Sequence, residues 1–203
     1  MMSQPKTPLT IGILALQGDF QKHADHVRSL DAEALLVRRP EDLEGIDGLI
    51  IPGGESTTIG KLLVAFKLVD PLQERLASGL PLFGTCAGLI LMAREIDGYD
   101  QFRLGTLDVT VTRNAYGRQI ESFEAEIPVE EPLHSPVRGV FIRAPRIIRL
   151  GDGVEVLATY EGDPVMVQQK NLLAASFHPE LTENREIHRY FIGMIQSRRE
   201  IQV

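Results

Sequence analysis

Apolar runs and helical patterns alternate through the first half of the chain. Residues 9–16 (LTIGILAL) form a continuous apolar run, and EALLVRR, IDGLIIPGG and PLFGT are further strand-like segments. Such runs are typical of parallel strands that are covered on both faces. Helical spacing is found in FQKHADHVRSL, IGKLLVAFKL, DPLQERLASG and AGLILMARE. This alternation predicts a mostly parallel sheet with helices on both faces.

The ends of two predicted helices follow from their capping residues. Hydroxyl and acidic side chains are favoured at an N-cap because they accept hydrogen bonds from the first free backbone N–H groups. Ser56 or Thr57 can cap the helix through IGKLLVAFKL. The next helix has Asp70 as its predicted N-cap, Pro71 at its first position and Gly79 after its end.

From residue 103 the pattern changes to short strand-like segments separated by Gly, Pro and Asp. We expect these segments to extend the sheet, with an antiparallel insertion around residues 103–150. A last helix is predicted from about Asn184. Its apolar stripe consists of Ile187, Phe191, Met194 and Ile195. The sequence thus predicts an α/β fold, a single-domain three-layer sandwich with a mostly parallel, flavodoxin-like sheet and a small antiparallel extension; a split into two domains is less favoured.

Composition narrows the class of protein. A chain of 203 residues suits one domain, and a net charge of −7 argues against nucleic acid or an anionic membrane as a partner. No apolar run is long enough to span a bilayer, and MMSQPKTPLT lacks the core of a secretory signal, so we expect a cytoplasmic protein. One cysteine provides neither an internal disulfide nor a thiolate-rich metal site. We expect no metal and no cofactor.

Cys86 lies in FGTCAG, where a predicted strand gives way to a predicted helix. In an open α/β sheet this turn lies at the carboxyl edge, where ligands bind. A nucleophile on such a turn needs small neighbours, which Gly84, Ala87 and Gly88 provide. The N-terminus of the following helix also favours a thiolate. From this segment alone, a nucleophile and a buried structural cysteine are about equally supported.

His178 follows the apolar segment LLAASF, which we expect to deliver it to the same sheet edge as Cys86. Pro179 is predicted to keep the chain extended, so that His178 and Glu180 point to the same side. Glu180 then orients the imidazole toward the sulfur, as in covalent acyl transfer. The alternative is an ordinary strand-end histidine. The other histidines are expected elsewhere: His23, His26 and His188 on solvated helix flanks, and His134 in a loop.

Gly53 and Gly54 end another predicted strand and precede a helix. A phosphate-binding loop does not fit, because five residues separate Gly54 from Gly60-Lys61 and Leu62 stands where that motif has Ser or Thr. Paired glycines beside a nucleophile suit an oxyanion hole, in which bare backbone N–H groups meet developing negative charge. A simple loop in a βα unit is the alternative.

The motifs PGGES, GTCAG and FHPE, in that order, resemble those of the triad (class I) glutamine amidotransferases. ILALQGDFQKH, PGGESTTIGKLL, GTCAGLILMA, TRNAYGRQIESFE, FIRAP and ASFHPE together resemble the glutaminase subunits of pyridoxal 5′-phosphate synthase. LQGDF and TRNAYGRQ argue against the glutaminase of imidazole-glycerol-phosphate synthase. The resemblance covers a glutaminase domain at about residues 10–197, with residues 1–9 and 198–203 as tails.

This resemblance implies a role for each site residue. Cys86 would attack the side-chain amide of L-glutamine, and His178, oriented by Glu180, would protonate the leaving ammonia and then activate water. The backbone amides of Gly54 and Ala87 would form the oxyanion hole. The implied glutamine pocket consists of Gly54, Glu55, Ser56, Arg113, Ile142 and Arg143. From the residues alone, both arginines would pass as surface residues, although an arginine suits the substrate α-carboxylate.

A protein partner is also implied. The ammonia would pass to a pyridoxal 5′-phosphate synthase subunit within a large hetero-oligomer, and Gln17 is similar to a residue that completes the oxyanion region at that interface. We expect the Gly53–Gly54 peptide to turn a carbonyl inward when idle and an N–H inward when docked. Two other functions stay open: a stand-alone cysteine hydrolase, and an inert regulatory or ligand-binding module.

Overall fold

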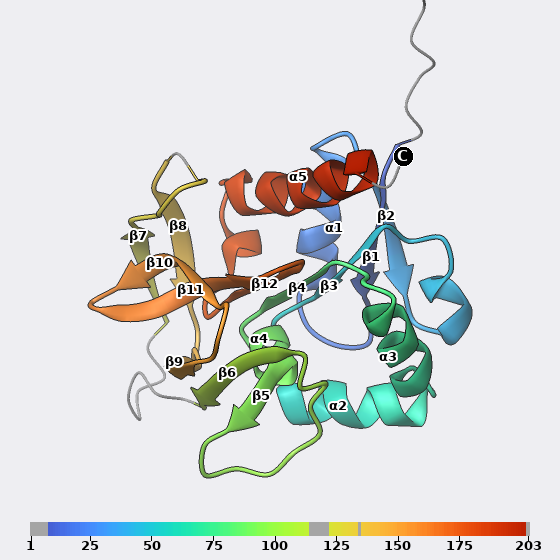
Figure 1. Ribbon diagram of the computed structural model, residues 1–203, viewed down its shortest axis with the longest axis horizontal. Helices are drawn as coiled ribbons and strands as arrows, with labels where there is room; N and C mark the ends of the chain where they lie inside the picture. The colour runs from blue at the N-terminus through green and yellow to red at the C-terminus, as the bar shows by residue number, and fades with distance from the viewer. Residues whose placement is uncertain (1–7, 114–121, 134, 202–203) are drawn as a thin grey trace, which may run out of the picture.

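The computed structural model describes residues 8–113, 122–133 and 135–201. A seven-stranded sheet forms its centre (Figure 1). Its strands are β1 (Thr10–Leu14), β2 (Glu33–Val37), β3 (Gly48–Ile51), β4 (Leu82–Thr85), β10 (Glu155–Tyr160), β11 (Asp163–Gln169) and β12 (Leu172–Ala175), in the spatial order β10-β11-β12-β4-β3-β1-β2. The strands from β12 to β2 pair in parallel, and β10 and β11 add an antiparallel edge. The predicted flavodoxin-like α/β fold is confirmed.

Helices cover both faces of this sheet, as Figure 1 shows. The helices α1 (Phe20–Arg28) and α5 (Glu186–Ile201) lie on one face, and α2 (Ser56–Ala65), α3 (Val69–Ala77) and α4 (Ala87–Met92) lie on the other. Successive strand residues point to opposite faces. In β3, Ile50 therefore packs with α1 and α5, whereas Leu49 and Ile51 pack with α2 and α4. Burial on both sides explains why these strands are continuous apolar runs.

Two smaller sheets replace the single insertion expected around residues 103–150. One sheet joins β5 (Ala93–Ile96), β6 (Leu107–Thr112) and β9 (Arg146–Leu150), and the other joins β7 (Phe123–Ile127) with β8 (Val137–Phe141). The β5–β6 pair is parallel, so the insertion is not wholly antiparallel. The helix expected over AGLILMARE was wrong in its last three residues: α4 ends at Met92, and pairing with β6 draws Ala93–Ile96 into a strand.

The helix ends also differ from the sequence expectation. The N-cap of α2 is Glu55, whose carboxylate accepts hydrogen bonds from the Thr57 and Thr58 N–H groups at 3.1 and 2.7 Å. The longer carboxylate side chain reaches these groups from one residue earlier than Ser56. Helix α3 begins at Val69, so Asp70 lies in its first turn and is not the cap. At the other end of the chain, α5 continues past residue 197 to Ile201.

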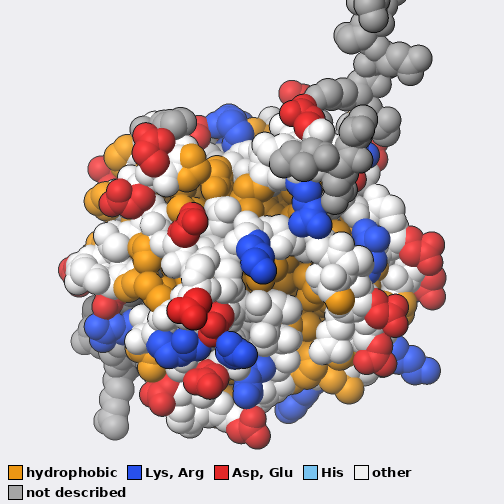
Figure 2. Space-filling view, viewed as in Figure 1, with side chains coloured by type: hydrophobic (Ala, Val, Ile, Leu, Met, Phe, Trp, Pro, Cys, Tyr) orange, Lys and Arg blue, Asp and Glu red, His pale blue; other side chains and the backbone are white. Residues whose placement is uncertain are grey.

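Surface charge is mixed on the face drawn in Figure 2, where acidic and basic side chains lie among each other. Among the described residues, no helix is both long and apolar enough to cross a membrane.

Two 3-10 helices complete the elements, η1 (Pro40–Leu43) and η2 (Pro179–Leu181). The second of these follows β12 and carries Glu180 to the carboxyl edge of the sheet, close to the end of β4.

Candidate active site

Cys86 lies on a strained turn between β4 and α4, with φ of 47° and ψ of −99°. Residues other than glycine rarely adopt this conformation, and it persists only where surrounding contacts hold it. The Cys86 N–H donates to the Ala175 carbonyl at 2.8 Å, and the Ile90 N–H donates to the Cys86 carbonyl at 3.2 Å. A Cβ atom on Gly88 would lie 2.2 Å from the Ile51 carbonyl oxygen. The turn therefore has the geometry of a nucleophile elbow.

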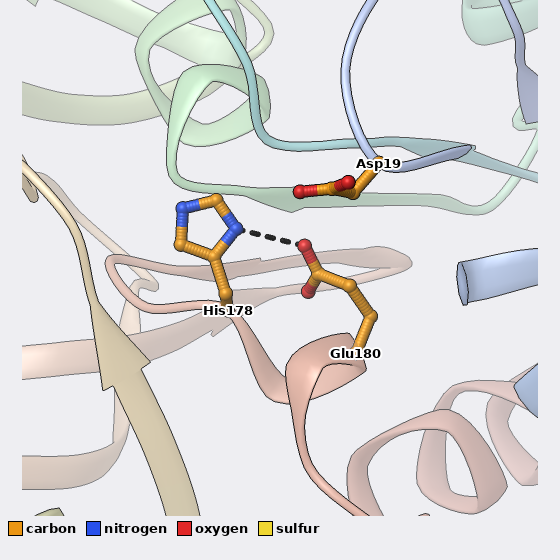
Figure 3. A group of neighbouring side chains, drawn as sticks. All are labelled: Asp19, His178 and Glu180. Carbon is orange, nitrogen blue, oxygen red and sulfur yellow. Dashed lines mark hydrogen bonds and ion pairs between the residues drawn. The ribbon is translucent and has the colours of Figure 1, made fainter. Parts of the chain in front are cut away.

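His178 and Glu180 form a buried pair beside this turn (Figure 3). Nδ1 of His178 lies 2.8 Å from Oε1 of Glu180, and the two residues are 5% and 1% exposed. The expected extended chain after His178 was wrong, because Pro179 begins the 3-10 turn η2. The fixed φ of proline suits the first position of a helix as well as an extended chain. The backbone N–H of His178 donates to the Val140 carbonyl at 2.8 Å, which anchors the pair.

The pKa values of His178 and Glu180 are shifted by their neighbours so that both side chains are charged. Burial alone would lower the pKa of His178, but hydrogen bonds with Cys86 and Glu180, together with their charges, raise it to about 10. Burial would raise the pKa of Glu180, but His23 and His178 hold it well below its usual range. At neutral pH the imidazole is therefore protonated beside an ionised carboxylate. An imidazolium next to a cysteine favours the thiolate, which is the reactive form.

Asp19, just before α1, adds a third titratable group (Figure 3). One potential ligand atom from each of Asp19, His178 and Glu180 lies within 4.8 Å of the others. Three such donors at this spacing are compatible with a metal site. The His178–Glu180 hydrogen bond, however, accounts for the two buried members as an acid–base pair, and Asp19 is exposed.

A pocket of about 280 Å³ opens in front of Cys86. Its walls bring together Gln17, Gly54, Glu55, Ser56, Cys86, Arg113, Ile142, Arg143 and His178, all of which the sequence predicted as site residues. Asp19 and Ile90 also line it and were not predicted. Two predicted site residues, Glu180 and Ala87, do not line this pocket. Glu180 lies behind His178, and Ala87 follows Cys86 as the first residue of α4.

Arg113 lines the pocket and contacts three neighbouring side chains. Its guanidinium lies 3.2 Å from Oε1 of Glu55, donates to Oε1 of Gln101 at 2.9 Å and lies 4.4 Å from the centre of the Tyr99 ring. Burial would raise the pKa of Glu55, but hydrogen bonds from Thr58 and Thr57 lower it to about 2. Arg113 is thus a fixed cation with a permanently ionised partner, which suits recognition of an anionic group.

The Gly53–Gly54 turn is packed closely against Gln17 and the start of α1. The Glu55 N–H donates to Oε1 of Gln17 at 2.8 Å, and the Gly53 carbonyl accepts from the Asp19 N–H at 3.3 Å. A Cβ atom on Gly54, whose φ is +158°, would lie 2.5 Å from Oε1 of Gln17. Sγ of Cys86 lies 3.8 Å from the Ile142 carbonyl oxygen.

Three histidines expected on solvated flanks are buried. His23 and His188 are 0% exposed and His26 is 8% exposed. The signal was present in the sequence: His23 comes three residues after Phe20 and four before Val27, so it lies on the apolar face of α1. Those expectations were therefore wrong. The prediction for His134 lies outside the described residues.

With this geometry in view, comparison with known proteins identifies the class. Residues 13–197 match the SNO glutamine amidotransferase family, and the chain belongs to this family of enzymes. A relative from Carboxydothermus hydrogenoformans, named pyridoxal 5′-phosphate synthase subunit PdxT, is 54% identical over 187 residues, covering 92% of this chain and 98% of the relative. A relative of the same name from Thermotoga maritima is 50% identical over 188 residues, covering 93% and 100%.

Solved structures agree with this assignment. A crystal structure of a glutamine amidotransferase superposes with a TM-score of 0.87 and 54% identity, covering 92% of this chain and 98% of the other. The structure of PurLQS from Thermotoga maritima superposes with a TM-score of 0.69 at 16% identity, covering 92% and 98%. The second likeness supports the fold alone.

Proposed function

We propose that this chain hydrolyses L-glutamine to L-glutamate and ammonia in the cytoplasm and passes the ammonia to a pyridoxal 5′-phosphate synthase subunit. The observation that carries the proposal is the strained Cys86 turn beside the His178–Glu180 pair, at the wall of one pocket. The names of the PdxT relatives supply the partner. A single thiol with no disulfide partner suits a reducing compartment.

The proposed chemistry has two steps that share one histidine. Sγ of Cys86 attacks the amide carbon of the glutamine side chain, and the His178 imidazolium gives its proton to the departing nitrogen, which leaves as ammonia. The neutral imidazole then takes a proton from water, the resulting hydroxide attacks the γ-glutamyl thioester, and the thiolate leaves. Glu180 keeps the His178 ring oriented in both steps. The backbone amides of Gly54 and Ala87 hold the oxyanion, and Arg113 receives the substrate α-carboxylate.

Coupling to the partner resides, in this proposal, in the Gly53–Gly54 peptide and Gln17. The Gly53 carbonyl is tied to the Asp19 N–H, so reversing this peptide breaks that bond. New contacts formed when the synthase subunit docks on the Gln17 side would compensate for the lost hydrogen bond. The paired glycines allow the rotation because neither carries a side chain. The rate of glutamine hydrolysis is thereby kept low when the synthase subunit is absent.

The test is glutamate release by the purified chain with and without the synthase subunit. We expect the rate to rise on mixing, pyridoxal 5′-phosphate to form in the mixture, and Cys86→Ala to abolish both. A glutamine-like electrophile should add once to Cys86, as measured by intact mass. Equal activity with and without the partner would instead indicate a stand-alone hydrolase, and absence of labelling even in the complex would contradict a catalytic Cys86.

A further inference from the structure

Behind Glu180, three buried histidines form a chain that the proposed reaction does not use. Nε2 of His23 lies 3.4 Å from Oε2 of Glu180 and 3.2 Å from Oγ1 of Thr85. Nδ1 of His23 lies 2.8 Å from Nε2 of His188, and Nδ1 of His188 lies 3.2 Å from Nδ1 of His26. The chain runs from the carboxylate to the edge of α1.

This chain is built from two helices that are far apart in sequence. His23 and His26 lie on α1, His188 lies on α5, and Glu180 reaches them from η2. Oε1 of Glu180 is taken by His178, and among the described residues Oε2 has no well-formed hydrogen bond and only the His23 contact. A buried carboxylate oxygen without a partner is costly, so His23 supplies a needed neighbour.

The direction of the contact between His23 and Glu180 follows from its two atoms. A carboxylate oxygen accepts hydrogen bonds and cannot donate, so Nε2 of His23 faces Oε2 of Glu180 as the donor atom. The same nitrogen lies 3.2 Å from Oγ1 of Thr85, a hydroxyl oxygen that can also accept from it. At the far end of the chain, the backbone of Thr182 hydrogen-bonds His26 in the sense that raises its pKa.

Burial acts on the two outer histidines of the chain. The pKa of His188 is lowered well below its usual value by burial and by its histidine neighbours, and that of His26 is lowered by burial, His23 and Arg185. Both rings are therefore neutral at pH 7, and a neutral ring can donate one hydrogen bond and accept another. The charged and titratable groups that surround Glu180 and the chain are His178, Asp19, Cys86 and Arg185.

We propose that His23 faces Oε2 of Glu180 with Nε2 as the donor atom and holds this carboxylate in place, and that His188 and His26 fix the orientation of His23. His23 is then a positioning residue, which keeps Glu180 aimed at His178. The proposal rests on the glutaminase function proposed above. It adds a fourth residue behind the Cys86-His178-Glu180 set.

Two variants test the donor atom of His23. His23→Gln places an amide N–H near the position of Nε2, whereas His23→Leu removes the donor and keeps an apolar side chain. Val27→Ala, a truncation at a fully buried position of the same helix, serves as the control for general loss of stability. Glutamine hydrolysis is measured for each variant in the complex with the synthase subunit, as kcat and KM across pH.

We expect His23→Leu to lower kcat roughly tenfold with little change in KM, as for a lost orienting partner. The acid limb of the pH profile should move to higher pH, because a buried Glu180 without a donor beside Oε2 is easier to protonate. His23→Gln should recover part of kcat and move the limb back. A pH profile of His23→Leu that matches that of Val27→Ala would overturn the positioning role.

A second measurement on the wild-type chain does not depend on activity or on a variant that may misfold. Nitrogen-15 NMR of labelled histidine at pH 7 should show a proton on Nε2 of His23. An Nε2 of His23 that carries no proton would overturn the proposal even if the complex is an active glutaminase. A wild-type complex that releases no glutamate would contradict the proposed function, while the NMR result still decides whether His23 faces Glu180 with a donor.

Discussion

Gly53 lies directly against the imidazole of His178: a Cβ atom at residue 53 would be 2.1 Å from Cε1 and 2.6 Å from Nδ1 of the ring. The hydrogen bond between Nδ1 of His178 and Glu180 also holds the ring, which limits how far it can move away. A glycine of the predicted oxyanion loop thus sets the position of the proposed general acid. The two halves of the site are in contact.

Gly53→Ala should therefore disable the site while leaving the fold intact. Displacement of His178 by about 1 Å is expected to lower kcat roughly 100-fold, because acid–base transfer depends on close alignment. The measurement is glutamate release in the complex, with circular dichroism to check folding. Gly193→Ala is the matched control, since a Cβ atom at residue 193 meets nothing within 4 Å. Equal rates for the two variants would contradict the packing argument.

Substitution of Cys86 should reveal the free-energy cost of the strained backbone at this position. Cys86→Gly and Cys86→Ala both remove the thiol, but only glycine adopts the φ of 47° without strain. We expect the glycine variant to be more stable than the alanine variant by about 1 kcal/mol, the usual size of such strain less the entropy cost of glycine. Urea denaturation of the two inactive proteins measures the difference. A more stable alanine variant would show that the turn is relaxed.

The raised pKa of His178 predicts a pH dependence of stability. The protonated ring pairs with Glu180 and Cys86, and its pKa rises from 6.5 to about 10 on folding. This contribution is fully present below pH 6.5 and is lost as the pH rises through 10. The stability gap between the wild type and His178→Gln should shrink over that range when measured by denaturant unfolding. A gap that does not change with pH would contradict the ion pair.

Arg113→Lys tests the proposed contact with the substrate α-carboxylate. Lysine keeps the charge but loses the planar fork that binds a carboxylate with two hydrogen bonds. We expect KM for glutamine to rise about tenfold with kcat largely retained, because a contact made equally in ground and transition states affects binding alone. Arg94→Lys is the control, as Arg94 pairs with Asp108 outside the pocket. A fall in kcat without a change in KM would place Arg113 elsewhere in the mechanism.

Part of the site was predictable because it follows from local rules. Parallel strands end at a common edge, so a cysteine after β4, paired glycines after β3 and a histidine after β12 were expected to meet there. Arg113 and Ile142-Arg143 came only from the family resemblance, since nothing in their local sequence distinguishes them from surface residues. The pocket contains all three.

The buried histidines show where local reasoning failed. Histidine on a helix is usually placed on the solvent-exposed side, but these three rings form hydrogen bonds to one another, and His23 also contacts Glu180, so their polar atoms have partners in the interior. Such mutual satisfaction depends on α1 and α5 lying side by side over the same sheet face, which no single segment encodes. The strand at Ala93–Ile96 has the same origin, because its pairing partner β6 lies further along the chain.

The sequence alone thus determined the α/β order of elements, the sheet edge that carries the candidate site, and the cysteine and histidine proposed to act there. These depend on periodicity, turn residues and short-range motifs. Only the tertiary structure decided the conformation of the Cys86 turn, the contact between Gly53 and His178 and the burial of three histidines behind Glu180. Those properties arise from close packing and burial, which bring together residues that are distant in the chain and change their electrostatic surroundings.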